Sequence, residues 1–424
     1  KIWEGIGDGW LRDSMQKVVR TTKSSLVEGY GGALFEALGF RYFGPVDGND
    51  IEAVVDALTR LKDIKGPRIL HTLTKKGKGY APAEADPTVW HAPGKFDAAT
   101  GCRVKSAHVA DRYQDVFGEV LTDLARVNAK VVGVTPAMAT GCGMITFAHE
   151  FPDRFFDVGI EEEHAVTFSA GMAAGGLKPF CNIYSSFSQR AYDEIIHDVA
   201  LQNLPVVLCF DRAGLVGEDG ATHNGCYDMA AYRSIPNAVI SAPRNEEELK
   251  NLMYTASLYK GGPFIIRYPR GCGEGVDWRN AEYRELEPGK GICLRKGSGM
   301  AIIAAGPEAC RAMEAADYIE ESTGISPSVY DIRYIKPIDV DILEEAAAEG
   351  CVLTVEEGCI KGGLFGAVAE YMASQGHQIV LDGLGIPDVY LSQDKQASQR
   401  AECGLDKAGI AGKAIFLLKN RKKV

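Results

Sequence analysis

An acidic cluster directly after a short apolar segment is the first candidate for chemistry in this chain. Residues 155–160 are mostly apolar and end at Glu161-Glu162-Glu163, after which small residues predict a helix. In an open α/β sheet, such a strand-to-helix corner is where ligands bind. A carboxyl group placed there, with an apolar strand behind it, is suited to proton transfer. An acidic helix N-terminus favoured by the helix dipole explains the same residues, so the cluster alone leaves both interpretations open.

Two more polar segments follow apolar runs further along the chain. The first begins at Tyr184 and contains Arg190, and the second begins at Asp211 and contains Asp219 and His223. Because polar groups that follow parallel strands meet at one edge of a sheet, we expect these side chains to converge. A simple Asp-Gly turn with an exposed histidine is the alternative interpretation of the second segment.

Taken together and in this order, the three segments resemble the pyrimidine-binding domain of thiamine diphosphate enzymes. Within that superfamily they are most similar to the 1-deoxy-D-xylulose-5-phosphate synthases, and the resemblance extends from residues 39–48 to residues 402–409. It implies an α/β fold with a three-domain transketolase-like architecture, in which mainly parallel sheets are covered by helices. It also implies a reaction that decarboxylates pyruvate and transfers the two-carbon unit to glyceraldehyde 3-phosphate, feeding isoprenoid, thiamine and pyridoxal biosynthesis.

The resemblance implies that thiamine diphosphate is the cofactor and assigns residues to its pyrimidine end. Glu162 matches the glutamate that hydrogen-bonds the pyrimidine nitrogen, a general acid/base role for one fixed carboxyl group in a dry site. Phe187 matches the aromatic residue that stacks on the pyrimidine, and Ile160 is a further expected cofactor contact. Helix capping for Glu162 and core packing for Phe187 are the structural alternatives.

The resemblance also assigns residues to the phosphate of the acceptor substrate. Tyr184, Arg190 and Arg270 match the positions expected to hold it. Two arginines on one pocket can grip a phosphate through planar, bidentate hydrogen bonds. If each arginine only forms a salt bridge with a neighbouring carboxylate, both are structural.

Three further residues are expected to handle protons and substrate hydroxyl groups. His91 matches an active-site histidine of the family, while Asp219 and His223 share one loop. Histidine suits this task because its charge changes near neutral pH. His164 and His197 lie within helical patterns and are expected to be structural.

Alternating apolar runs and helical patterns divide the chain into three expected domains. Residues 1–108 are expected to be a linker and the carboxyl-terminal part of a diphosphate-binding domain, so that this first domain is incomplete. The resemblance implies that residues 109–285 form the pyrimidine-binding domain and residues 286–424 a transketolase-like carboxyl-terminal domain. The alternation predicts parallel sheets covered on both faces. It predicts a helix over 50–62 and strands over 68–73, 131–134, 178–183, 205–210, 238–241, 264–268, 300–305, 328–332 and 351–355.

Composition and charge limit the function classes. The 424 residues are 46% hydrophobic and 24% charged, an ordinary profile for a water-soluble protein. The net charge of −11 argues against nucleic-acid binding and against an anionic membrane surface.

The longest uncharged apolar stretch, residues 165–177, is too short to span a bilayer, and no signal peptide is visible. Eleven cysteines without a Cys-x-x-Cys pair indicate neither zinc nor a disulfide framework. A cytoplasmic location, or a plastid one in a plant-type host, is expected.

The opening residues contain Gly7-Asp8-Gly9, which does not fit the magnesium–diphosphate motif of thiamine enzymes. That motif follows an apolar strand and precedes an asparagine, whereas here the first asparagine is Asn49. Asp-Gly in a loop is usually a turn. We therefore expect no metal ligands in this chain. Mg²⁺ would be held by an amino-terminal segment that the chain lacks, and the chain alone would be inactive.

Other functions remain open beside this one. Another transketolase-like enzyme, such as a transketolase or the β-subunit of a 2-oxo-acid dehydrogenase, would share the fold. The segment from Tyr184 to Arg190 and the first-domain residues argue against the β-subunit. A third possibility is a half-protein that completes its site only with a separate amino-terminal chain. Family members pair into dimers, so a homodimer is expected.

Overall fold

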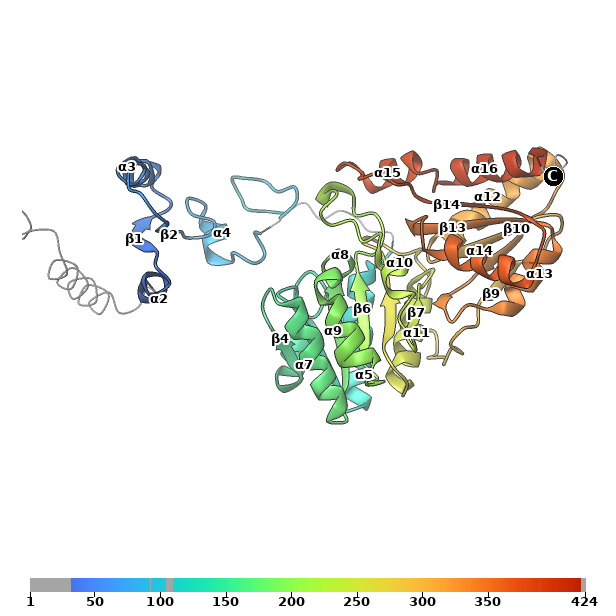
Figure 1. Ribbon diagram of the computed structural model, residues 1–424, viewed down its shortest axis with the longest axis horizontal. Coiled ribbons are helices and arrows are strands. Elements are labelled where there is room, and N and C mark those ends of the chain that lie inside the picture. The colour runs from blue at the N-terminus through green and yellow to red at the C-terminus, as the bar shows by residue number, and fades with distance from the viewer. Residues whose placement is uncertain (1–31, 92, 104–109, 421–424) are drawn as a thin grey trace, which may run out of the picture. The chain divides into compact units, whose positions relative to one another are not determined.

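The computed structural model describes residues 32–91, 93–103 and 110–420. The triplet Gly7-Asp8-Gly9 lies outside these residues. The chain divides into two compact units, residues 1–107 and 108–424, which are described here separately (Figure 1).

The first unit is built around a parallel β–α–β element. Strands β1 and β2 pair in parallel, and the helix between them corresponds to the helix predicted over 50–62. The side chain of Asp50 caps this helix by accepting hydrogen bonds from the backbone N–H groups of Glu52 and Ala53. The elements are α2 (Gly32–Ala37), β1 (Arg41–Asp47), α3 (Ile51–Leu61), β2 (Arg68–Leu73) and α4 (Ala81–Ala85).

A seven-stranded sheet forms the first half of the second unit. Its strand order is β12-β7-β8-β6-β5-β3-β4, and all pairs are parallel except β12 with β7. Strands appear within two residues of every position predicted between residues 131 and 268. The strands are β3 (Val131–Thr135), β4 (Phe155–Asp157), β5 (Lys178–Tyr184), β6 (Val207–Asp211), β7 (Val239–Ser241), β8 (Phe264–Arg267) and β12 (Tyr334–Lys336).

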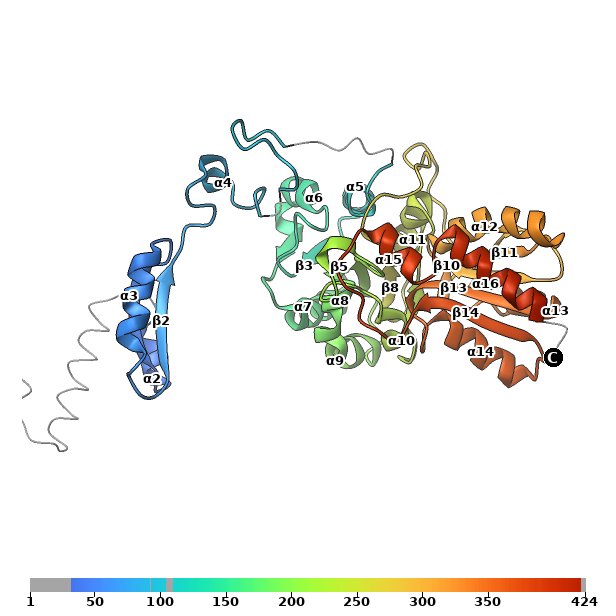
Figure 2. The same ribbon diagram turned by 90° about the horizontal axis from the view of Figure 1, so that it is seen from above.

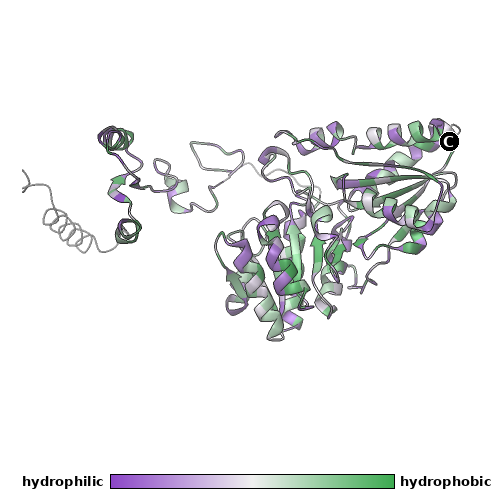
Figure 3. Ribbon diagram, in the orientation of Figure 1, coloured by the Kyte–Doolittle hydropathy of each residue, from purple (hydrophilic) through white to green (hydrophobic). Residues whose placement is uncertain are grey.

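Helices cover both faces of this sheet, as Figures 1 and 2 show. Alternate residues of each strand point to opposite faces, so Leu208 and Phe210 pack with α7, while Val207 and Cys209 pack with α5 and α11. Figure 3 shows the resulting hydrophobic strands between more polar helices. The helices are α5 (Tyr113–Val127), α6 (Ile145–Glu150), η1 (Pro152–Arg154), α7 (Glu162–Ala174), α8 (Ser185–Ser188), η2 (Gln189–Ala191), α9 (Tyr192–Glu194), η3 (Ile195–Ala200), η4 (Gly217–Asp219), α10 (Asp228–Tyr232) and α11 (Glu246–Leu258).

A five-stranded sheet forms the second half of the same unit. Its order is β14-β13-β10-β11-β9, and only β9 is antiparallel to its neighbour. Helices α12 and α16 cover one face, and α13 and α14 cover the other. The elements are β9 (Ile292–Arg295), β10 (Ala301–Ala305), α12 (Glu308–Thr323), β11 (Ser328–Asp331), α13 (Val340–Ala348), β13 (Cys351–Cys359), α14 (Leu364–Gln375), β14 (Val380–Ile386), α15 (Gln396–Glu402) and α16 (Lys407–Asn420).

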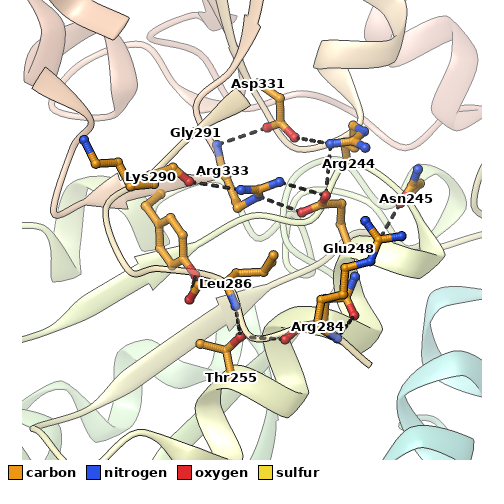
Figure 4. Close-up of polar contacts among 12 residues, drawn as sticks. Arg244, Asn245, Glu248, Thr255, Arg284, Leu286, Lys290, Gly291, Asp331 and Arg333 are labelled. Carbon is orange, nitrogen blue, oxygen red and sulfur yellow. Dashed lines mark hydrogen bonds and ion pairs between the residues drawn. The ribbon is translucent and has the colours of Figure 1, made fainter. Parts of the chain in front are cut away.

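The two halves of this unit are interlocked. Strand β12, which lies beyond residue 286 in the chain, adds an edge to the seven-stranded sheet by pairing with β7. Charged side chains fix this crossing (Figure 4): Arg333 binds Glu248 at 2.8 Å, and Arg244 binds Asp331 at 3.0 Å. The architecture is thus α/β with mainly parallel sheets and helices on their faces, as the sequence predicts. The three domain boundaries stay predictions.

Within the residues that the structure describes, each helix is either too short or too polar to cross a membrane.

Candidate active site

The predicted site residues of the second unit follow the carboxyl ends of its parallel strands. Glu162 comes after β4, Phe187 after β5, His223 after β6 and Arg270 after β8. The strands are neighbours in the order β8-β6-β5-β3-β4. The structure therefore places these side chains along one edge of the sheet, where open α/β sheets bind ligands.

Glu162 is a buried carboxylate at the first residue of α7, with 2% of its surface exposed. Its Oε1 accepts a hydrogen bond from Nη1 of Arg190 at 2.8 Å. Among the described residues, this is the only hydrogen bond of the Glu162 side chain, and it joins Glu162 to η2, which carries Arg190. No hydrogen bond runs from the carboxylate to the backbone N–H groups of α7. This geometry counts against the helix-capping interpretation, because a capping carboxylate binds the first N–H groups of its own helix.

An aromatic group stands beside this ion pair. The guanidinium carbon of Arg190 lies 5.0 Å from the ring centre of Phe187. Phe187 stacks on Tyr184 at 5.5 Å between ring centres and meets His223 edge-on at 5.2 Å. Thr222 Oγ1 lies 2.8 Å from Nδ1 of His223. One continuous set of contacts thus joins the acidic cluster, the segment after β5 and the loop after β6.

Asp219, on the loop after β6, and Arg270, in the segment after β8, form a second group. Nε of Arg270 lies 3.5 Å from Oδ2 of Asp219, and its Nη1 lies 3.0 Å from Oε2 of Glu218. Its Nη1 also donates to the carbonyl of Val216. Both arginines assigned to phosphate therefore pair with carboxylates, and no contact in the described chain joins Arg190 to Arg270. Their convergence on one phosphate stays a prediction.

Ile160 and His91 are placed differently from the other assigned residues. Ile160 precedes α7 and exposes 77% of its surface, so its side chain does not belong to the packed core. His91 is exposed and belongs to the first unit. Their assigned roles at the cofactor and in proton transfer stay predictions.

Two buried charged residues at the same edge had no role from the sequence. Asp211 ends β6, and Nη1 of Arg212 binds its Oδ2 at 2.7 Å. The guanidinium carbon of Arg212 lies 4.3 Å from the ring centre of Tyr184, and its φ of +60° is rare for a residue with a side chain. Burial raises the pKa of Asp211, although Arg212 opposes this shift. Their position at a strand end was visible in the sequence, but the strained backbone was not.

The pyrimidine end of thiamine diphosphate fits this edge better than the diphosphate end does. The resemblance implies a carboxylate and an aromatic ring at that end, and Glu162 is buried and Phe187 partly buried at this edge. Their contact with the cofactor stays a prediction. Among the described residues, no group of three or more His, Cys, Asp or Glu side chains could hold a metal ion.

A cavity of about 220 Å³ lies next to α8. None of the residues predicted to bind cofactor or substrate, or to act in catalysis, lines this cavity. The predicted roles therefore do not involve it. Its lining residues are Ser185, Ser186, Ser188, Gln189, Tyr192, Asn224, Gly225, Tyr227, Asp228, Ala231 and Tyr232.

Comparisons with known proteins show which family the chain resembles. Three family models match the chain: 1-deoxy-D-xylulose-5-phosphate synthase over residues 5–74, the pyrimidine-binding domain of transketolase over 111–274, and the carboxyl-terminal domain of transketolase over 289–410.

Two curated relatives carry the name 1-deoxy-D-xylulose-5-phosphate synthase. The protein of Phocaeicola vulgatus is 48% identical over 96% of this chain, and that of Bacteroides thetaiotaomicron is 51% identical over 89%. The matched parts are 64% and 59% of those relatives, so the chain spans about three fifths of their length.

A solved structure described as a split-gene transketolase, an inactive β4 tetramer, is similar in fold. Its TM-score is 0.65 at 29% identity, and the match covers 72% of this chain and 99% of that one.

Proposed function

We propose that this chain, which belongs to the 1-deoxy-D-xylulose-5-phosphate synthase family of transketolase-like enzymes, carries the pyrimidine end of a thiamine diphosphate site. The whole protein would decarboxylate pyruvate and transfer the two-carbon unit to glyceraldehyde 3-phosphate. The observation that carries the proposal is the buried Glu162 carboxylate, bound by Arg190 beside the ring of Phe187 at the ligand-binding edge of the sheet.

Thiamine diphosphate, when bound, supplies the nucleophilic carbon that attacks the keto group of pyruvate. Glu162 would bind the pyrimidine nitrogen and exchange a proton with it through its carboxylate. This role is supported because Oε1 is held by Arg190, while Oε2 has no hydrogen-bond partner among the described residues. Phe187 would pack against the pyrimidine ring, and Ile160 would add an apolar contact.

Acceptor recognition is proposed for the loop after β6 and for Arg270. Arg270 can exchange its present contacts with Asp219 and Glu218 for a phosphate, since a guanidinium group binds either anion in the same fork geometry. Asp219 would then be available for substrate hydroxyl groups. His223 would exchange protons through Nε2, because Nδ1 faces the hydroxyl of Thr222. Tyr184, Arg190 and His91 retain the roles that the resemblance implies.

Three finer expectations belong to the same proposal. Mg²⁺ would accompany the diphosphate, although the described residues offer no cluster for it. The protein would act as a homodimer, and its location would be cytoplasmic. The acidic net charge of −11 supports neither nucleic acid nor an anionic membrane as a partner.

A half-protein is the second candidate, and one observation favours it. The split-gene transketolase is similar over 99% of its own chain and is described as inactive in that form. A chain that completes its site with a separate polypeptide would show the same pattern of similarity. The identities of 48% and 51% to 1-deoxy-D-xylulose-5-phosphate synthases favour that reaction over the transketolase reaction in either case.

The test supplies the chain with the segment of the Bacteroides thetaiotaomicron relative that it does not match. The mixture receives thiamine diphosphate, Mg²⁺, pyruvate and glyceraldehyde 3-phosphate. We expect release of CO₂ and steady formation of 1-deoxy-D-xylulose 5-phosphate. Turnover of a ketose phosphate donor in place of pyruvate would instead identify a transketolase. Absence of both reactions, with cofactor binding confirmed, would contradict the proposal.

A further inference from the structure

The loop that carries Asp219 is held by side chains from the far end of the chain. The loop spans residues 212–220, after β6. Three residues beyond position 286 bind its backbone: Glu357 on β13, and Gln396 and Gln399 on α15. Hydrogen bonds over such long sequence separations are built by the fold and not by local turn preference.

Gln399 uses both ends of its amide and is completely buried. Its Oε1 accepts from the N–H of Gly217 at 2.9 Å, and its Nε2 donates to the carbonyl of Ser392 at 2.9 Å. A buried amide satisfied in this way fixes the backbone it binds, because losing the bond would leave polar groups unpaired without water.

Gln396 joins the loop to the segment that carries Arg270. Its Nε2 donates to the carbonyl of Leu215 at 2.6 Å and to the carbonyl of Arg270 at 3.2 Å. Gln396 and Gln399 are three residues apart on α15, so both face the loop from one side of the helix. The helix therefore binds the backbone of Arg270 directly and holds Asp219 through the backbones of Leu215 and Gly217 on the same loop.

Glu357 holds the start of the loop and leaves no room for a side chain there. Its Oε1 accepts from the N–H of Leu215 at 2.9 Å, and its Oε2 accepts from Nε of Arg400, also on α15, at 2.6 Å. Gly214 has a φ of +86°, and a Cβ on it would lie 2.7 Å from Oε1 of Glu357. Glycine is needed at this position for both reasons.

We propose that α15 is a clamp for the acceptor-binding loop, and that Gln396 and Gln399 are positioning residues for Asp219 and Arg270. The carboxyl-terminal half of the second unit thereby sets the affinity for the acceptor without touching it. This inference rests on the proposed function for the identity of the acceptor, while the clamp itself can be tested without turnover.

The first experiment measures hydrogen–deuterium exchange of the 424-residue chain by mass spectrometry. Gln399→Leu removes both the acceptor and the donor of its amide, and Gln396→Ala, at a less buried position, serves where the first variant folds poorly. We expect exchange in residues 213–221 to be about tenfold faster, because a tenfold change corresponds to the loss of one to two net hydrogen bonds. Peptides from β5 and α12 should be unchanged. Gln375→Ala, an exposed glutamine on α14, is the matched control.

Two results would contradict the proposal that α15 holds this loop. One is exchange in residues 213–221 that stays within about twofold of wild type in both variants. The other is acceleration spread evenly over residues 286–424, which would mean that the glutamines only stabilise their own half.

The second experiment uses the active mixture described under the proposed function. Gln396→Ala should raise KM for glyceraldehyde 3-phosphate about tenfold while KM for pyruvate and kcat change less than about twofold. A purely structural role lowers the amount of active enzyme and hence kcat, with both KM values unchanged, and would count against positioning. A mixture that shows no turnover with the wild-type chain contradicts the proposed function, and leaves the exchange result to decide the clamp.

Discussion

The partner of Glu162 distinguishes a chemical role from a capping role more clearly than the acidity of the segment does. Three consecutive glutamates span the N-cap and the first two residues of α7, but only the middle one is buried, and its carboxylate binds a side chain of another element. A carboxylate that only stabilised the helix dipole would gain as much from solvent exposure. The burial of Glu162 therefore points to a task outside the helix.

Replacing Glu162 with glutamine tests this task in the active mixture. An amide cannot exchange the proton that the pyrimidine nitrogen needs, so we expect the rate to fall about 10²–10⁴-fold with the fold retained. Deuterium exchange at the reactive carbon of thiamine diphosphate reports the step directly. Glu161→Gln, an exposed neighbour in the same cluster, should exchange at the wild-type rate. Equal rates for the two variants would mean that another carboxylate performs the task.

Replacing Arg190 and replacing Arg270 are predicted to have different effects on the kinetics with the acceptor. Arg270→Ala should raise KM for glyceraldehyde 3-phosphate about tenfold or more and leave unphosphorylated glyceraldehyde unaffected, because a charge-assisted hydrogen bond is lost. Arg190→Ala should raise the same KM and should also lower turnover with both acceptors, since Arg190 orients Glu162 at 2.8 Å. Steady-state kinetics with both acceptors, and melting temperatures as a control for folding, provide the measurement. If Arg190→Ala acts on the phosphorylated acceptor alone, its pairing with Glu162 is incidental.

The sequence predicted the positions of these site residues better than it predicted their binding partners. Glu162, Phe187, Asp219 and Arg270 all lie at the predicted edge, because each follows an apolar strand. The ion pair of Glu162 with Arg190 could not be foreseen, since the turn between β5 and α9 that aims Arg190 leaves no periodic pattern.

The first residue of helix α12, Glu308, carries a carboxyl group in an unfavourable environment. Glu308 is 1% exposed, and its Oε2 has no hydrogen-bond partner in the described chain. Burial raises the pKa of Glu308 to about 7, and Arg311 beside it offsets only part of this shift. Burial also opposes the charge of Glu357 nearby, but Arg400 and Arg311 outweigh it and lower the pKa of Glu357 to about 2.

This environment predicts a pH dependence of stability. A raised pKa means that the folded chain retains a proton that the unfolded chain releases, so the stabilisation is complete below pH 4.5 and is lost as pH rises through about 7. The melting temperature of Glu308→Gln should therefore fall less than that of wild type between about pH 6 and about pH 8. Other buried carboxyls, such as Glu356 with a pKa raised to about 7, are present in both proteins and cancel in the comparison. Glu321→Gln, exposed on the same helix, should follow wild type; a Glu308→Gln slope equal to wild type would contradict the prediction.

Local patterns predicted the elements well where the element is buried and continuous. Every predicted strand of the second unit is present, because four to six apolar residues between turn residues are too few for a typical helix but enough for a buried strand. Strand β12 was not predicted, and α15 was given no role. The position of β12 depends on pairing with β7, and that of α15 on glutamines that bind a distant loop, so neither depends on its own sequence pattern.

For the molecule as a whole, we predict that the 424 residues alone do not turn over substrate. The chain matches 64% and 59% of the length of two 1-deoxy-D-xylulose-5-phosphate synthases, so part of their sequence has no counterpart in it. Product formation from pyruvate and glyceraldehyde 3-phosphate by the purified chain is the measurement, with the supplemented mixture as positive control. Steady turnover by the chain alone would show that its own residues complete the site.

The crossing of β12 into the neighbouring sheet also bears on inheritance. Recombination that exchanged residues 286–424 between two relatives would pair the recipient's β7 with the donor's β12, and Glu248 with the donor's residue in place of Arg333. Where the donor's β12 does not fit, strand β7 would be left with unpaired backbone groups, a known route to aggregation. Surviving crossovers within residues 108–424 should thus be rare, and the two halves should pass between lineages as a single heritable block.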